Sequence, residues 1–340
     1  MAGILRYLEA IVRRDRRETG GYSERDITDD HNDYKQYMVM LMEERIHTPV
    51  MLQEVLRYLE PSPGKILVDA TTGTGGHSLE LAERIAPNGR LICIDRDEES
   101  LGVARERLAK FGDMCSFRYG NFLETDKILE DLRISKIDGI LFDLGISSFQ
   151  LDNPRRGFSF REEGPLDMRM DRNSYISAYD LLNNLNEEEI SNILKVFGEE
   201  RWHNRIARLV VKEREKNPIS TTAQLSDIVL KAIPQRMRYV HYRIHPATRT
   251  FQAVRIAVNR ELEALETAMQ KVTDFLDKGA KMCIISFQSL EDRSVKLYFR
   301  KSMSLQVIKI LTPKPLTPLE AEIVHNPRSR SAKMRVAQKQ

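Results

Sequence analysis

The sequence has few cysteines, a single tryptophan and no long apolar run. Its three cysteines are Cys93, Cys115 and Cys283, in a chain of 340 residues. No CxxC pair or histidine cluster with metal-ligand spacing occurs, so we expect neither a disulfide framework nor a bound metal. Each cysteine lies in a short apolar stretch typical of a strand, which predicts buried, reduced thiols.

Segments that would direct the chain to a membrane or out of the cell are also missing. No run approaches the roughly 18 apolar residues of a membrane span, and the first residues hold no continuous apolar segment after their charges, as a signal peptide would. Residues 1–45 carry eight basic and ten acidic residues, whereas a mitochondrial presequence is poor in acids. We therefore expect a cytoplasmic protein without a membrane partner, a mitochondrial one being the alternative. Residues 1–45 are predicted to be a partly ordered N-terminal extension.

Basic charge, in contrast, is present in two blocks. The net charge is only +3, but residues 231–260 hold seven Lys or Arg and residues 324–340 hold five, with no Asp or Glu in either block. Such blocks in a nearly neutral chain favour a polyanion partner, with a solvated charged face as the alternative.

From residue 65 onward, short apolar runs alternate with helical periodicity, which is typical of a parallel α/β sheet. Strands are predicted at 65–71, 90–95, 116–119, 137–144, 281–287, 305–310 and 332–337, and the main helices between them at 78–85, 98–111 and 290–300. The stretch from about 155 to 245 has helical segments at 187–196, 202–216 and 222–232 and no convincing strand, and one long helix is predicted over 251–276. The predicted fold class is therefore α/β: a Rossmann-like seven-stranded sheet with an inserted all-helical domain.

A glycine-rich turn follows the first predicted strand. It reads TTGTGGH over residues 71–77 and precedes a helix, so a ligand can approach the backbone and the free N–H groups at the helix start. The second strand ends at Asp95, 22 positions after Gly73, where a carboxylate can accept both ribose hydroxyls of a nucleoside. The turn lacks the third glycine of a GxGxxG fingerprint, which favours S-adenosylmethionine, a cofactor without phosphate, over NAD.

Two further segments end at the same predicted sheet edge. The fourth strand runs into DLGISSFQ, residues 143–150, which provides Asp143 and Gln150. An acidic group there can face the positive end of the cofactor. Phe122 follows the third strand and either lies against the adenine or belongs to the apolar core, which the spacing does not decide.

These segments resemble a known family, the bacterial 16S ribosomal RNA methyltransferases that modify the exocyclic amine of a cytosine in the decoding region. The matching segments run from residue 46 to the C-terminus and lie at 47–52, 69–78, 94–97, 138–148, 156–160, 164–171, 245–255, 285–293 and 326–331. The resemblance implies S-adenosylmethionine as cofactor, with contacts at Gly75, Gly76, His77, Asp95, Phe122, Asp143 and Gln150. It also implies 16S ribosomal RNA or the small ribosomal subunit as partner. Residues 46–150 and 246–340 would form the methyltransferase domain and 151–245 an inserted substrate-recognition domain.

The sequence departs from the family pattern in three places. The 45 N-terminal residues exceed the usual start, Phe149 stands where proline is common, and Gln288 stands where a Ser-Phe-His-Ser segment usually has histidine. The last departure leaves an alternative open: a protein that keeps the fold and binds RNA as a ribosome-assembly factor but does not catalyse methyl transfer.

Methylation of a cytosine amine requires in-line placement of the amine and an acceptor for one of its N–H groups, but no strong base. Asp143 is the candidate catalytic acceptor, although the resemblance also assigns it to the cofactor. The target base must leave any stack, so a single-stranded or flipped cytosine is expected.

Basic residues in and after the insertion are the candidates for RNA contacts, because cations interleaved with rings near residues 236–243 suit phosphates and bases. The candidate substrate-binding residues are Arg156, Arg169, Arg243 and Arg249. An amine in protein or DNA remains an alternative substrate, and a NAD-dependent oxidoreductase an alternative enzyme. The sequence leaves the oligomeric state open, a homodimer included.

Overall fold

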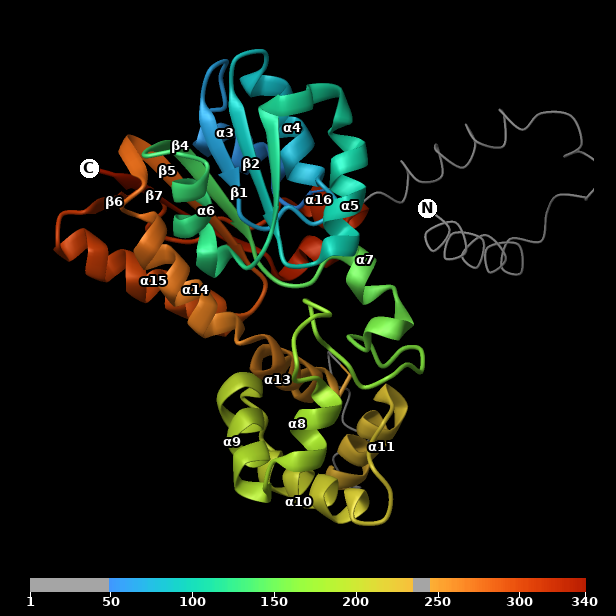
Figure 1. Cartoon of the computed structure of the whole chain (residues 1–340). Helices are drawn as coiled ribbons and strands as arrows, with labels where there is room; N and C mark the ends of the chain where they lie inside the picture. Colours follow the sequence, from blue (N-terminus) through green and yellow to red (C-terminus); the bar gives the residue numbers. More distant parts are fainter. Residues whose placement is uncertain (1–48, 235–244) are drawn as a thin grey trace, which may run out of the picture. The chain divides into compact units, whose positions relative to one another are not determined.

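The computed structural model describes residues 49–234 and 245–340 (Figure 1). The extension expected over residues 1–45 and the stretch 236–243 lie outside the described residues. The described chain forms a seven-stranded sheet in the order β3-β2-β1-β4-β5-β7-β6, in which β7 lies antiparallel between β5 and β6 and the other pairs are parallel. The strands are β1 Ile66–Asp69, β2 Arg90–Asp95, β3 Cys115–Tyr119, β4 Ile137–Asp143, β5 Leu276–Ser286, β6 Ile308–Ile310 and β7 Lys333–Lys339. This confirms the predicted fold class, although β5 begins before residue 281, its predicted start.

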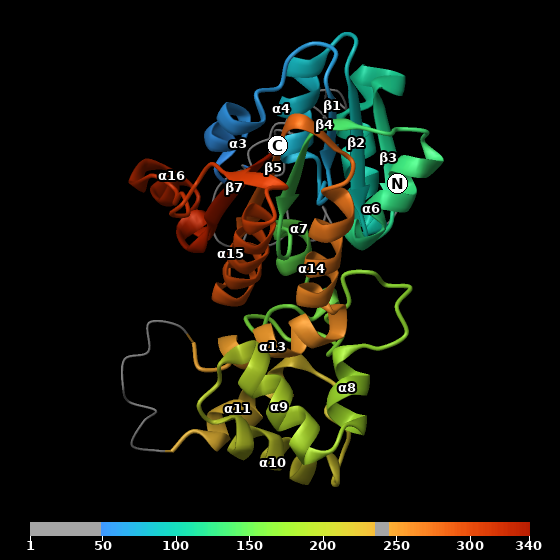
Figure 2. The same ribbon diagram turned by 90° about the vertical axis from the view of Figure 1, so that its left-hand side faces the viewer.

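Side chains of the central strands alternate between two buried clusters, one on each face of the sheet. In β2, Ile92 and Ile94 join one cluster while Leu91 and Cys93 join the other. Successive strand residues point to opposite faces, so burial of both faces requires the near-continuous apolar runs seen in the sequence. The first cluster includes residues of α6 (Thr125–Asp131), α14 (Glu261–Val272) and α15 (Ser289–Ser304), and the second includes residues of α3 (Leu52–Leu59), α4 (Gly76–Ile85) and α5 (Glu98–Arg107). Figure 2 shows α14 and α15 side by side.

The inserted helices have an apolar cluster of their own. They are α8 Ala178–Asn184, α9 Glu187–Gly198, α10 His203–Arg214 and α11 Thr222–Ala232. Capping boxes begin three of them, because Ser177, Asn186 and Thr221 each accept an N–H bond from the third helical residue. Buried residues of α13 (Thr248–Asn259) also belong to this cluster. The helical core therefore continues past residue 245, where the sequence analysis divides the domains.

The prediction of a single long helix over residues 251–276 is wrong. The segment forms two helices, α13 and α14, separated by Arg260, whose φ of 48° lies in the left-handed region. Phe251 and Val254 of α13 pack with the inserted helices, whereas Leu265 and Met269 of α14 pack on the sheet. Apolar residues recur at helical spacing on both sides of the break, so periodicity does not reveal that they face different cores.

Two negative findings concern the parts of the chain at 49–234 and 245–340. No helix there has the length and apolar character needed to cross a bilayer. No set of three or more His, Cys, Asp or Glu side chains there is arranged to hold a metal ion.

Candidate cofactor pocket and active site

A pocket lies at the edge of the sheet where β1, β2 and β4 end. The carboxyl ends of parallel strands meet at this edge, which is where open α/β sheets bind ligands. Most of its lining comes from the turn after β1, from the ends of β2 and β4, from residues that follow β2, β3 and β4, and from α14 and α15. Six of the seven residues predicted to contact a cofactor line it: Gly76, His77, Asp95, Phe122, Asp143 and Gln150.

Gly75, the seventh, is not among the residues that line the pocket. It precedes α4 with a φ of 83°, and a Cβ built on it would lie 2.8 Å from the Cδ1 of Leu108 and 3.3 Å from the Cβ of Ala104. A side chain is therefore disfavoured both by the backbone conformation and by the close approach of this neighbouring segment. Gly75 lets α4 begin where Gly76 can present its backbone to the pocket.

Asp95, at the end of β2, is held by the backbone on both of its oxygens. Oδ2 accepts a hydrogen bond from the N–H of Gly73 at 2.6 Å, and Oδ1 accepts one from the N–H of Asp97 at 2.8 Å. Burial raises the pKa of Asp95 to about 6, although these two bonds oppose the shift. Each oxygen keeps a second lone pair, so a bound diol can still be accepted.

Phe122 belongs both to the pocket lining and to the apolar core. It lines the pocket, and its ring also meets Phe142 of the core edge-on, at 5.8 Å between centroids. Its rigid place in the core provides a fixed apolar surface for a planar base.

Asp143, the last residue of β4, has a buried oxygen with no hydrogen-bond partner among the described residues. That oxygen is Oδ1, while Oδ2 lies 3.5 Å from Nδ1 of His77. Nε2 of His77 lies 3.0 Å from the carbonyl of Val50. A carbonyl only accepts, so Nε2 carries the proton there and Nδ1 of a neutral ring is an acceptor facing Asp143.

Carboxyl groups concentrate around the floor of the pocket. Burial, and then the charges of Asp69 and Glu291, raise the pKa of Asp143 well above its usual range. Burial raises the pKa of Asp69 to about 6 against a 2.6 Å hydrogen bond from Ser78, and burial also raises the pKa of Glu291. Of these three carboxyls, Asp143 and Glu291 line the pocket, and the cost of ionising buried acids there favours a ligand with a positive charge. The residues present thus fit a cationic nucleoside, with Asp95 for its ribose, Phe122 for its base and Asp143 for its charge.

Comparisons with known proteins identify the family. Residues 44–340 match the family model described as the MraW methylase family. The chain is 48% identical over 308 residues to "Ribosomal RNA small subunit methyltransferase H" of Geotalea uraniireducens, covering 86% of this chain and 98% of that protein. A protein of the same description from Halothermothrix orenii is 46% identical over 308 residues, with the same coverage. The chain belongs to the MraW methylase family.

Gln150 in this MraW-family chain uses its amide to hold the loop after β4. Its Oε1 accepts a hydrogen bond from the N–H of Ser147, and its Nε2 donates to Oδ2 of Asp97 at 2.7 Å. Only 5% of the residue is exposed. The side chain thus forms pocket wall, while one of its two N–H donors and one lone pair of its oxygen stabilise the protein itself.

Gln288, which stands where the family pattern has histidine, begins α15 and lies outside the pocket lining. Its Nε2 donates to Glu291 at 2.9 Å, and its Oε1 accepts from Nε2 of Gln252 in α13 at 2.6 Å. Gln288 thus links α13 to the buried carboxylate of Glu291, which does line the pocket.

The four arginines proposed from sequence to bind substrate occupy different environments. Arg156 is only 1% exposed and pairs with Asp97. Arg169 is partly exposed and pairs with Asp167, while Arg249 is exposed and donates to the carbonyl of Glu199. Arg243 lies outside the described residues. The structure therefore places Arg169 and Arg249 where solvent can reach them, and Arg156 where it cannot.

Several lining residues were missed by sequence reasoning. Glu261 and Leu265 line the pocket from α14, which the expected single long helix concealed. Glu291 lies within a segment that matches the family pattern, so its acidity was a usable signal. Met170 and Arg96 also lie within matching segments, at 164–171 and 94–97, but neither residue type by itself indicates a ligand contact.

Proposed function

We propose that this chain transfers the methyl group of S-adenosylmethionine to the exocyclic amine of a cytosine in 16S ribosomal RNA. The observation that carries the proposal is the buried Oδ1 of Asp143, which has no hydrogen-bond partner among the described residues, in a pocket that Asp95 also lines, in a chain of the MraW methylase family. The printed names of its relatives, ribosomal RNA small subunit methyltransferases, support the choice of substrate.

In this proposal different pocket residues bind different parts of the cofactor. S-adenosylmethionine, when bound, supplies an electrophilic methyl group. Asp95 accepts hydrogen bonds from the ribose hydroxyls, Phe122 lies against the adenine, and Gly76 and His77 bind the carboxylate at the start of α4, where the helix dipole favours an anion.

Asp143 acts as both charge partner and hydrogen-bond acceptor. Its ionised carboxylate offsets positive charge in the pocket and accepts an N–H of the target amine, which keeps the nitrogen lone pair available for attack. The amine loses its extra proton readily after transfer, so no stronger base is needed. Orientation of the amine provides the rest of the rate enhancement.

Substrate recognition is assigned to the insertion and the chain that follows it. Arg169, Arg243 and Arg249 contact phosphates of the RNA. The target cytosine leaves its stack before it reacts. Arg156 is assigned a supporting role instead, because it is buried. The domain division at 46–150, 151–245 and 246–340, a cytoplasmic location beside ribosomes, and a homodimer also remain predictions; sedimentation equilibrium tests the last.

The test is to incubate the purified protein with radiolabelled S-adenosylmethionine and small subunits from cells that lack the activity, and then to map the label by nucleoside mass spectrometry. We expect label on a cytosine amine, lost in Asp95→Asn. The matched control is Asp277→Asn, which changes an exposed residue at the start of β5, whereas the pocket lies where the strands end. This variant should keep activity. Cofactor binding without label on any RNA would support the assembly-factor alternative, and binding of NAD alone would support an oxidoreductase.

A further inference from the structure

Met170 is the point at which the insertion reaches the pocket. Of the described residues between 151 and 245, it alone lines the pocket, and it is 3% exposed. Its sulfur contacts the guanidinium of Arg96, which follows Asp95 directly in sequence and also lines the pocket. The inserted domain therefore affects the shape of the pocket most directly through this one side chain.

The backbone of Met170 is fixed from both sides by side chains. Its carbonyl accepts a hydrogen bond from Nη2 of Arg156 at 2.8 Å, and its N–H donates to Oδ1 of Asn259 at 2.8 Å. Asn259 also donates to the carbonyl of Met168 at 2.7 Å, and Arg156 to that of Arg169 at 3.1 Å. The segment 168–170 is thus held in place through hydrogen bonds from two directions.

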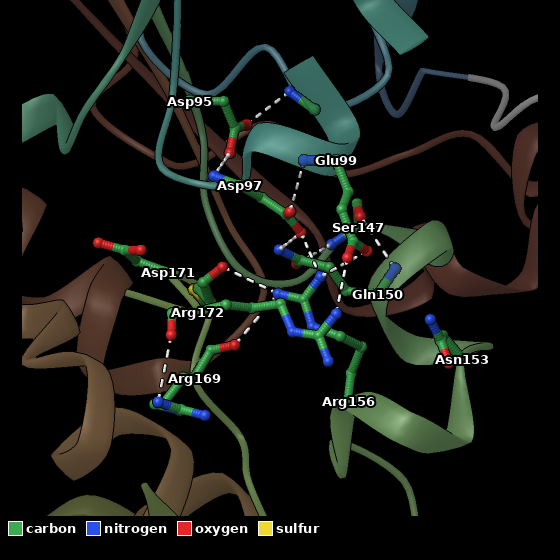
Figure 3. Close-up of polar contacts among 12 residues, drawn as sticks. Asp95, Asp97, Glu99, Ser147, Gln150, Asn153, Arg156, Arg169, Asp171 and Arg172 are labelled. Atoms are coloured by element: carbon green, nitrogen blue, oxygen red, sulfur yellow. Dashed lines mark hydrogen bonds and ion pairs between the residues drawn. The ribbon is translucent and has the colours of Figure 1, made fainter. Parts of the chain in front are cut away.

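Arg156 is itself held by Asp97, which also contacts Asp95 and Gln150 of the pocket. Its Nη1 donates to Oδ2 of Asp97 at 2.7 Å, and each of these two side chains is 2% exposed (Figure 3). The same Oδ2 accepts from Gln150, while the backbone N–H of Asp97 donates to Asp95. Asp97 is therefore in direct contact with two residues of the cofactor pocket and with the arginine that holds Met170.

We propose that the buried Asp97–Arg156 ion pair is a positioning device that sets Met170 in the pocket wall and thereby aligns the inserted domain with the bound cofactor. Burial of two charges is compensated only while their geometry is kept, so the pair resists displacement of either segment. Arg is suited to this place because one planar guanidinium donates at once to Asp97 and to two carbonyls, which an ammonium group cannot match. The reaction that the device serves rests on the proposed function.

The first test follows Met170 directly and does not require methyl transfer. Methionines are labelled with 13C at the methyl group, and the Met170 resonance is assigned by its loss in Met170→Leu. We expect S-adenosylmethionine to shift this resonance in the wild-type protein, and Arg156→Lys to displace it before cofactor is added. Met334, buried in the cluster on the α3 face of the sheet, should not respond to Arg156→Lys.

Matched variants separate the ion pair from general effects of charge. Arg172→Lys changes a half-exposed arginine that contacts Glu99, the residue also near Arg156, and should leave the Met170 resonance in place. Asn259→Ala removes the other anchor without altering a charge and should displace the resonance as Arg156→Lys does. If Arg156→Lys does not fold, Asp97→Asn, which removes the charge that pairs with Arg156 and keeps a side-chain oxygen for Gln150, tests the ion pair in its place. A Met170 resonance unchanged in the folded variants would overturn the proposal.

A double-mutant cycle tests whether Arg156 acts through Met170. We expect Arg156→Lys and Met170→Ala each to slow single-turnover methyl transfer about tenfold, and the double variant to be slowed about tenfold rather than a hundredfold. Multiplicative losses would show that the two residues act independently and would reject the coupling. Absence of methylation by the wild-type protein would reject the proposed function, whereas the resonance experiment would still report on the ion pair.

Discussion

At the scale of the residue, the decisive feature is a carboxyl group whose ionisation is unfavourable until a ligand arrives. Asp143 is faced by Asp69 from β1, His77 from α4 and Glu291 from α15, and burial raises its pKa. A cation in the pocket favours the ionised form, so binding of a positively charged cofactor should release a proton. Binding of a positively charged cofactor should therefore depend on pH.

The corresponding prediction concerns cofactor affinity. Because burial raises the pKa of Asp143, affinity for S-adenosylmethionine should rise with pH, by up to about tenfold per unit, over the pH range in which Asp143 loses its proton in the free protein. S-adenosylhomocysteine lacks the sulfonium charge and should show a weaker dependence. In Asp143→Asn the affinity for S-adenosylmethionine should fall about tenfold or more and lose this pH dependence. Titration calorimetry from pH 6 to 9 measures both effects; equal pH profiles for the two ligands would contradict the assignment.

At the scale of the element, the turn before α4 depends on a glycine that does not line the pocket. Gly75 combines a positive φ with a site where a Cβ would meet Leu108 and Ala104. The glycine-rich turn of the sequence therefore contains two kinds of glycine: Gly73 and Gly76 line the pocket, and Gly75 permits close packing.

Gly75→Ala should lower the free energy of unfolding by about 1–3 kcal/mol, because it adds both strain and overlap. The matched control is Gly102→Ala in α5, where no atom lies within 4 Å of a built Cβ. That change should raise the free energy of unfolding by roughly 0.5–1 kcal/mol, since alanine is the better helix former. Urea unfolding of both variants measures the difference, and destabilisation by the two changes alike would argue against the packing explanation.

Gln288, at the start of α15, stands where the family pattern has histidine, and substitutions there test how the chain tolerates this difference. A neutral imidazole offers one donor and one acceptor, which is what Gln288 uses toward Glu291 and Gln252. Gln288→His should therefore keep the methyl-transfer rate within about threefold, whereas Gln288→Ala should reduce it by roughly tenfold by leaving polar groups unpaired. Rates under single-turnover conditions compare the variants. A large gain in rate with histidine would mean that the residue takes part in the chemistry itself.

At the scale of the whole molecule, the buried Asp97–Arg156 pair joins the end of β2 to the insertion. Arg156→Ala leaves the carboxylate of Asp97 buried with Gln150 and a backbone N–H but without a counter-charge, and should lower the free energy of unfolding by about 3–5 kcal/mol. Arg156→Ala combined with Asp97→Ala should cost less than the sum of the single changes. Denaturant unfolding checks this, and a loss below about 1 kcal/mol in Arg156→Ala would place the pair in solvent.

The sequence alone determined the features that depend on local chemistry. Apolar runs and helical periodicity predicted the seven strands and the inserted helices α9, α10 and α11, because both faces of a parallel sheet are buried and each amphipathic helix shows its period. The short helix α8 was not predicted. The spacing of Gly73 and Asp95 predicted the cofactor pocket, and the quoted segments predicted the family. These signals lie within short stretches of chain, so no folded context was needed to read them.

Only the tertiary structure decided which face each segment buries and which charges are paired. Arg156 and Arg169 look alike in sequence, yet one is enclosed with Asp97 and the other is partly exposed. The break at Arg260 was invisible because α13 and α14 keep apolar periodicity while packing on different cores. Met170 belongs to the pocket through contacts with Arg156 and Asn259, which lie 14 and 89 positions away in the sequence. Burial and long-range pairing are properties of the packed chain, and local pattern does not contain them.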